Sequence, residues 1–352
     1  MHARRTTLIA AAAAAAFTLA GCSAASPSAL PADGEDGGSL VVYAPMDDAR
    51  IDFVTEQAKE DLGIELTIVG GGGGDLATRL EAEKNNAQAD VVVGLGESLL
   101  NRLDAQDMFD HYTPAWADLI PEQFRDDDAG FSLFTQTPIV IGYDTAHLGN
   151  AEAPDAWLDL AAPEYAEKFV FPATTGQTGQ AAIVGILWRY ADPETGEVSP
   201  EGWDALAAIL QNAKQLSDGQ QFDWDWVASG ELPVVVNWLG GVQIGADDND
   251  LDIAVVDTDG GTPFVSTGVA IVNGTDRAEQ AQRFLDWFGS ADFQVAYVEA
   301  THNDTPLNSD AVARLPEAAA ALDSLTKQDI DWSVVTPHLT EWMQKVQLEI
   351  LG

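Results

Sequence analysis

Tryptophan and aspartate alternate in one short stretch of the chain. Trp224 and Trp226 are interleaved with Asp223 and Asp225, and Trp238 follows soon after. An indole face attracts an ammonium or thiazolium group by about 0.5–2 kcal/mol. Tryptophan also buries a large apolar area, so core packing is the alternative role of each ring. The pattern predicts either a site for an organic cation or a tryptophan-rich core.

Two loops carry groups that suit an anion. Thr174, Thr175 and Gly176 precede a predicted helix, and hydroxyls and free amides at a helix start bind oxyanions. Threonine also caps helices without any ligand. The glycine run 70–74, with Gly73 as its candidate contact, either wraps an anion or makes a tight turn. It is not a P-loop, because no Lys-Ser/Thr follows it.

Acidic side chains follow two of the predicted strands. Asp47 and Asp48 lie after the first strand, and Glu97 after the third. In this position they would pair with a cationic group of a bound solute. The alternative is that they are solvated carboxylates that cap the following helices.

Catalytic patterns are missing from the sequence. The five histidines are too dispersed for an HExxH motif, no G-x-S-x-G elbow occurs, and Cys22 is the only cysteine. We therefore expect no enzyme activity, no metal and no cofactor. A lipid-anchored hydrolase, with an active site assembled from distant residues, is the alternative.

The first residues predict export. Arg4 and Arg5 precede the apolar run 8–19, which is shorter than the ~20 residues that a membrane-spanning helix needs. Leu19-Ala20-Gly21-Cys22 resembles a bacterial lipobox, which implies cleavage before Cys22 and acylation of its thiol. Residues 1–21 would be the signal peptide and 22–38 a flexible tether. The alternative is an ordinary cleaved signal peptide.

The net charge of the chain limits the kinds of partner that it can bind. The formal net charge is −41, which opposes binding to nucleic acid or to anionic lipid. Solubility is its simplest explanation, and attraction of a cationic solute is a weaker one. A hydrophobic content of 46% with 10 tryptophans indicates a folded chain.

Strand and helix patterns alternate along the chain. Strands at 40–43, 64–69 and 89–93 are separated by helices at 49–62 and 76–83. This order predicts a parallel sheet whose strand ends face the ligand. A second α/β set follows from residue 139, and helices close the chain. The further expected strands are 139–143, 169–171, 234–238, 252–256 and 268–272, and the further expected helices are 179–190, 203–215, 278–288 and 336–351.

Six ordered segments resemble one family. They are LVVYA at 40–44, GDLATRL at 74–80 with QADV at 88–91, GLGESLLNRL at 94–103, PIVIGYD at 138–144, VASGE at 227–231, and GVAIV at 268–272 with 281–293. Together they are similar to the iron(III)/thiamine-type solute-binding proteins of bacterial ABC importers.

The resemblance implies an α/β, two-lobed periplasmic-binding-protein-like fold (type II). Each lobe would be a mostly parallel sheet flanked by helices, with two crossover strands at the hinge. Lobe one would comprise 39–138 and 273–352, and lobe two 139–272. The solute would be trapped between the lobes, which implies a monomer that serves an ABC permease and its ATPase from the extracytoplasmic face of the membrane.

One departure from the family bears on the solute. Ferric-ion members carry two adjacent tyrosines where this chain has Asn237 and Trp238, and Asp47 stands in place of their histidine. The resemblance also places Asp304 near a late hinge contact. We therefore expect an organic cation or zwitterion, such as a thiamine-like or aminoalkylphosphonate compound. A ferric ion or metal complex is the alternative.

Overall fold

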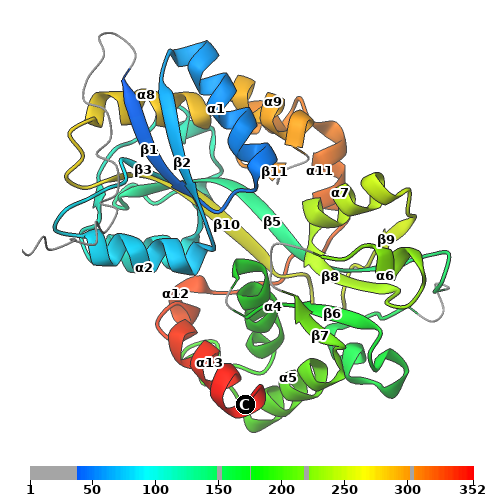
Figure 1. Ribbon diagram of the computed structural model, residues 1–352. Helices are drawn as coiled ribbons and strands as arrows, with labels where there is room; N and C mark the ends of the chain where they lie inside the picture. Colours follow the sequence, from blue (N-terminus) through cyan, green and yellow to red (C-terminus); the bar gives the residue numbers. More distant parts are fainter. Residues whose placement is uncertain (1–37, 149–152, 175, 218–221, 302–304) are drawn as a thin grey trace, which may run out of the picture. The chain divides into compact units, whose positions relative to one another are not determined.

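The computed structural model describes residues 38–148, 153–174, 176–217, 222–301 and 305–352 (Figure 1). The predicted signal peptide, Cys22 and all of the predicted tether except Gly38 lie outside these ranges. Within them, no helix is both long and apolar enough to cross a bilayer.

A parallel sheet forms from the first part of the chain, as expected. Its strands are, in spatial order, β2 (Glu65–Gly70), β1 (Ser39–Ala44) and β3 (Val91–Gly96). Each strand leads into a helix, namely α1 (Asp48–Leu62), α2 (Gly73–Glu83) and α3 (Glu97–Asp104). Figure 1 shows α1 and α2 on opposite sides of these strands. The loops after the strands therefore meet at one edge of the sheet.

A second parallel set forms from the middle of the chain. Its strands are β7 (Gln215–Ser217), β6 (Phe169–Pro172) and β8 (Val234–Trp238). Its helices are α4 (Gln177–Trp188), α5 (Pro200–Asn212), α6 (Asp225–Ala228) and α7 (Leu239–Asn249). The helix expected at 203–215 ends earlier, because Gln215 begins β7 beside β6.

Two long antiparallel strands connect the sets within the described chain. They are β5 (Phe131–Asp144) and β10 (Phe264–Val272), paired from Phe264↔Pro138 to Ala270↔Phe131. β10 also pairs with β3, and β5 with β8, so the spatial order is β2-β1-β3-β10-β5-β8-β6-β7. The short strands β4 (Phe109–Asp110), β9 (Ile253–Val255) and β11 (Thr305–Pro306) extend this arrangement. These are the crossovers that the sequence predicted.

Separate apolar clusters fill the two halves. Phe284, Phe288 and Tyr297 pack with the first sheet, whereas Phe169, Phe171 and Trp157 pack with the second. The first cluster includes residues of α8 (Ala278–Phe288) and α9 (Ala291–Thr301), which precede α10 (Ser309–Val312) and α11 (Pro316–Asp323). Short 3-10 helices lie at Ala117–Leu119, Glu122–Phe124, Trp157–Ala161 and Pro163–Tyr165.

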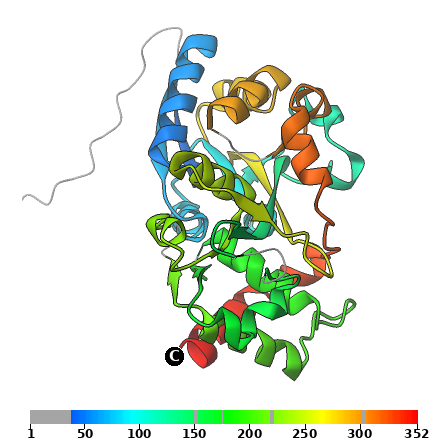
Figure 2. The same ribbon diagram turned by 90° about the vertical axis from the view of Figure 1, so that its right-hand side faces the viewer.

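The C-terminal helices pack with the second cluster. They are α12 (Trp332–Val335), α13 (Leu339–Lys345) and a π-helix at Val346–Ile350. Val335, Trp342 and Val346 are buried among residues of β6, α4 and α5. Figures 1 and 2 both show the red helices beside the green ones. The lobe boundaries stay a prediction, and from this packing we propose that 332–350 belong with lobe two rather than lobe one.

The first cluster offers a test of core packing. Phe288 is fully buried, and its ring meets Phe134 edge-on at a centroid distance of 5.1 Å. Phe288→Ala should lower the free energy of unfolding by about 3–5 kcal/mol, since it removes a ring and leaves a cavity. Urea denaturation measures the loss. Leu348→Ala, at a side chain that is 77% exposed, should change it by less than about 0.5 kcal/mol. Equal losses of unfolding free energy in Phe288→Ala and Leu348→Ala would contradict the packing of Phe288 in the core.

Candidate functional site

A cleft of about 390 Å³ lies at the strand ends of both sheets, beside the crossover strands. The β1–α1 loop, the start of α2 and the end of β3 line it from the first sheet. The β6–α4 loop and the end of β8 line it from the second. The crossover strands contribute Phe134, Thr137, Ile139, Val265 and Thr267, and α9 contributes Tyr297.

Besides α1, whose N-cap Asp47 lines the cleft, three further helices of the described chain begin there. Their N-cap residues are Gly72 for α2, Gly176 for α4 and Trp238 for α7, and all three line the cleft. None of these side chains has an oxygen that could accept from the first helix amides. Because the first amides of a helix lack intrahelical acceptors, helix starts of this kind favour an anionic group.

Arg50 carries a positive charge into the same cleft. Its Nε donates to Asp47 Oδ2 at 3.0 Å, and its guanidinium carbon lies 5.8 Å from the centroid of the Trp238 ring. Asp47 also caps α1, because its Oδ1 accepts from the backbone N–H of Arg50 at 2.9 Å. The protein's own cation therefore lies between the carboxylate and the indole that were expected to hold a solute cation.

Some of the predicted residues come together here. Asp47, Gly73, Gly176 and Trp238 line the cleft. Thr174 belongs to the same β6–α4 loop but is buried, and its hydroxyl accepts from the side-chain amide of Gln347. Thr174 thus ties the loop to the C-terminal π-helix.

Other predicted residues lie outside the lining. Asp48 is the first residue of α1, and the Asn237 side chain accepts from the backbone N–H of Trp238 at 2.9 Å. Trp224 packs against Phe222 at 4.9 Å, which is the core role that was its alternative. The ring of Trp226 lies 5.4 Å from the Lys214 ammonium. Of the three tryptophans considered for a cation site, Trp238 lines this cleft and Trp224 and Trp226 do not.

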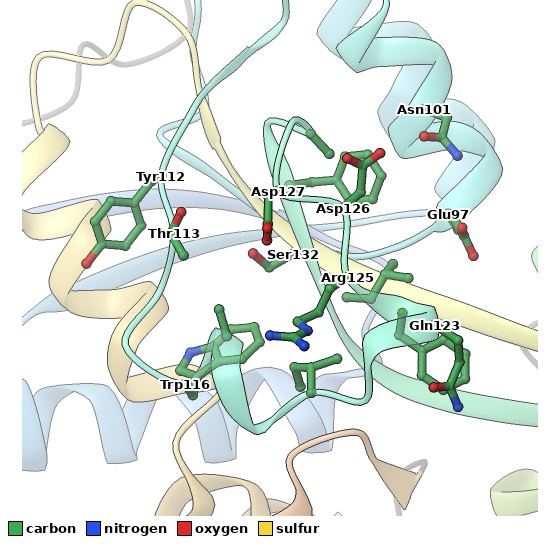
Figure 3. Close-up of a pocket in the computed structure, with 16 residues that line it drawn as sticks. Glu97, Asn101, Tyr112, Thr113, Trp116, Gln123, Arg125, Asp126, Asp127 and Ser132 are labelled. Carbon is green, nitrogen blue, oxygen red and sulfur yellow. The ribbon is translucent and has the colours of Figure 1, made fainter.

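Glu97 lines different cavities. One is a pocket of about 100 Å³ beside α3 and β5, where Figure 3 shows Glu97 and Asn101 on one side and Arg125 beside Trp116. Burial raises the pKa of Glu97, an effect that the charge of Lys327 partly offsets. Burial likewise lowers the pKa of Lys327. The remaining predicted contacts, Thr175 and Asp304, lie outside the described residues.

Several lining residues were not foreseen. Arg50 follows Asp47 by one helical turn, so the expected cap could have revealed their pairing. Thr137 and Ile139, like Val265 and Thr267, are two residues apart, and strand alternation along the predicted crossovers could have found them. Asp75, Gln177 and Tyr297 had no such signal. Among the described residues, no three His, Cys, Asp or Glu side chains gather as a metal site would require.

Comparison of the sequence identifies relatives. Residues 86–329 match the family model described as bacterial extracellular solute-binding protein. A probable ABC transporter periplasmic-binding protein, y4fP of Sinorhizobium fredii, is 41% identical over 313 residues, covering 89% of this chain and 86% of that protein. The Fe(3+)-binding periplasmic protein of Serratia marcescens is 23% identical over 259 residues, covering 70% of this chain and 72% of that protein. Both relatives are named as periplasmic binding proteins.

Solved structures share the fold. The periplasmic binding protein AfuA from Actinobacillus pleuropneumoniae, with fructose-6-phosphate bound, superimposes with a TM-score of 0.75 at 19% identity, covering 89% of this chain and 99% of that one. A periplasmic thiamin binding protein superimposes with a TM-score of 0.74 at 20% identity, covering 91% of this chain and 98% of that one. The predicted two-lobed α/β fold is thereby confirmed.

The β6–α4 loop gives a test of how the cleft is shaped. A methyl group at Gly179 would overlap the carbonyl oxygen of Ala173, whereas at Gly176 the nearest heavy atom would be 3.6 Å away. Gly179→Ala should therefore cost about 1–3 kcal/mol of unfolding free energy, although alanine is normally the better helix residue. Gly176→Ala is the matched control; it meets no overlap and should cost less than about 1 kcal/mol, the loss expected from alanine as a poorer N-cap residue. Urea denaturation distinguishes them, and an unchanged Gly179→Ala protein would contradict the loop geometry.

Proposed function

The chain belongs to the bacterial extracellular solute-binding proteins, and on this premise we propose that it captures a small organic solute by an anionic oxygen group. The captured solute would be delivered to an ABC permease. The observation that carries the solute class is the guanidinium of Arg50 in the cleft.

Arg50 changes the electrostatics expected from the sequence. A solute ammonium on the Trp238 face would have to displace a guanidinium that already lies there, and would meet an Asp47 carboxylate that is already paired. An oxyanion meets donors instead. Guanidinium forms strong, directional hydrogen bonds with phosphate and carboxylate oxygens, and the three helix starts add backbone amides.

The opposite end of the solute can carry a positive charge. Asp75 lies in the first turn of α2, is exposed, and lines the cleft. A zwitterion such as an aminoalkylphosphonate would place its phosphonate at Arg50 and its ammonium at Asp75. A cleft of about 390 Å³ is in the size range of small-molecule sites. A thiamine-like cation without an acidic group fits this arrangement less well.

Ferric ion remains the second candidate. Asp47, Asp75 and Tyr297 line the cleft and have side chains with oxygen atoms, the type of ligand that hard cations prefer. The Serratia marcescens relative is named for Fe(3+). A metal–anion complex would use both the carboxylates and Arg50.

A thermal-shift panel separates these solutes. The probes are 2-aminoethylphosphonate, fructose 6-phosphate, thiamine and ferric citrate. A ligand at 100 times its dissociation constant adds about 2.7 kcal/mol of stability. We expect the phosphorus-containing probes to raise the melting temperature and thiamine to leave it unchanged. A shift with thiamine alone would contradict the proposal, and a coloured ferric complex that Tyr297→Phe abolishes would establish the second candidate.

Arg50 is the residue to change. Arg50→Gln should weaken binding of 2-aminoethylphosphonate by about tenfold to a hundredfold, because hydrogen bonds to a charged group are worth about 1.5–3 kcal/mol. Isothermal titration measures the change. The control is Arg314→Gln, which removes the same charge from a surface pair with Asp292 and should leave affinity unaltered. Equal affinity of Arg50→Gln and the unchanged chain would remove Arg50 from the site.

We also propose that the protein is a monomer held at the extracytoplasmic face by lipid on Cys22. The lipobox-like sequence at 19–22 supports the anchor, and the periplasmic location named for the relatives supports export.

Lipid attachment needs the thiol of Cys22. Cys22→Ala should therefore yield a protein released from the membrane or an uncleaved precursor, whereas the unchanged chain partitions into detergent. Detergent phase separation followed by mass spectrometry gives the result. A mature, acylated Cys22→Ala protein would show that the anchor lies elsewhere.

A further inference from the structure

We propose that Gln177 is an interlobe latch, whose side-chain amide enters a slot between glycines of the opposite lobe as the cleft closes. Gln177 would thus help to set how firmly the cleft closes on its solute. This inference rests on the proposed function, since it concerns closure of the same cleft.

Gln177 reaches from one core to the other. It is the first residue of α4, a helix whose apolar residues belong to the second cluster. Its Nε2 donates to the carbonyl oxygen of Gly94, in β3 of the first sheet, at 3.4 Å. The side chain therefore connects the lobes beside the solute cleft, which it also lines.

Glycines on the first lobe make room for this side chain. A methyl group at Gly73 would lie 2.7 Å from Gln177 Nε2, and one at Gly96 would lie 2.6 Å from Gln177 Oε1. The backbone does not demand glycine at either position, because Gly96 has a φ of −65° and Gly73 is helical. The space taken by the Gln177 amide is what excludes a larger residue at Gly73 and Gly96.

The latch is incompletely bonded. Among the described residues, no donor reaches the buried Oε1 of Gln177, and the bond to Gly94 is long. A buried carbonyl oxygen without a donor disfavours the state that buries it. The latch fits by shape but holds weakly by hydrogen bonding. Closure of the cleft then depends on the bound solute. A protein that captures and later releases its solute requires this dependence.

The first experiment needs no solute. In the Cys22→Ser chain, which has no natural thiol, the pair Gly73→Cys/Gln177→Cys should form a disulfide. The added sulfur at position 177 would take the place of Cγ, which lies 3.2 Å from the methyl position of residue 73. The control pair is Gly71→Cys/Gln177→Cys, because a methyl at Gly71 contacts Leu76 and not Gln177.

Mass spectrometry after alkylation follows disulfide formation under mild oxidation. We expect the 73/177 pair to link at least tenfold faster than the 71/177 pair, and the linked protein to have a smaller radius of gyration in solution scattering. Equal rates, or no link at 73/177, would overturn the latch while leaving the proposed solute class untouched.

The second experiment tests the slot. Gly96→Ala should weaken binding of 2-aminoethylphosphonate at least tenfold, because the new methyl group meets the Gln177 amide. Adding Gln177→Ala should restore affinity to that of Gln177→Ala alone, since the obstruction is gone. Losses that simply multiply in the double variant would show that Gly96 and Gln177 act independently and would overturn the latch.

Discussion

The ladder between β5 and β10 is the constraint on which the rest of the structure depends. Seven residue pairs, from Phe264↔Pro138 to Ala270↔Phe131, join the strands that belong to both halves. Each crossover strand then pairs with a different parallel sheet, β10 with β3 and β5 with β8. The ends of both parallel sets are thereby directed to one cleft, although their cores are separate. Small rotations about these two strands would open or close that cleft.

The anion site that we propose lies in an acidic protein, so short-range interactions in the cleft must outweigh the net charge. The chain carries a formal net charge of −41, yet exposed charges more than about 8 Å away are largely screened at physiological ionic strength. Inside the cleft, the guanidinium of Arg50 and the helix amides of α2, α4 and α7 are close to any solute. Asp47 accepts from Nε of that guanidinium and so helps to hold it in place. Net charge therefore describes the solubility of this protein better than it describes its solute.

Sequence patterns predicted the fold better than the site. The segments 234–238, predicted as a buried strand from its apolar run, and 278–288, predicted as a helix, became β8 and α8 with the bounds observed, because burial leaves such local patterns in the sequence. The site depends on distant packing that no local pattern records. Trp224 and Trp238 looked equivalent in sequence, but Trp224 packs on Gly245 and Phe222 while Trp238 ends a strand at the cleft. Gln177 acquires its position only when α4 meets β3, so its neighbours at Gly73 and Gly96 could not be read from the chain.

A crystal structure grown with 2-aminoethylphosphonate tests the central claim most directly, because it shows which end of a zwitterion Arg50 receives. The account predicts phosphonate oxygens within hydrogen-bonding distance of the Arg50 guanidinium and of amides at the start of α4, with the ammonium toward Asp75. An ammonium on the face of Trp238, with Arg50 displaced and the phosphonate in solvent, would contradict it.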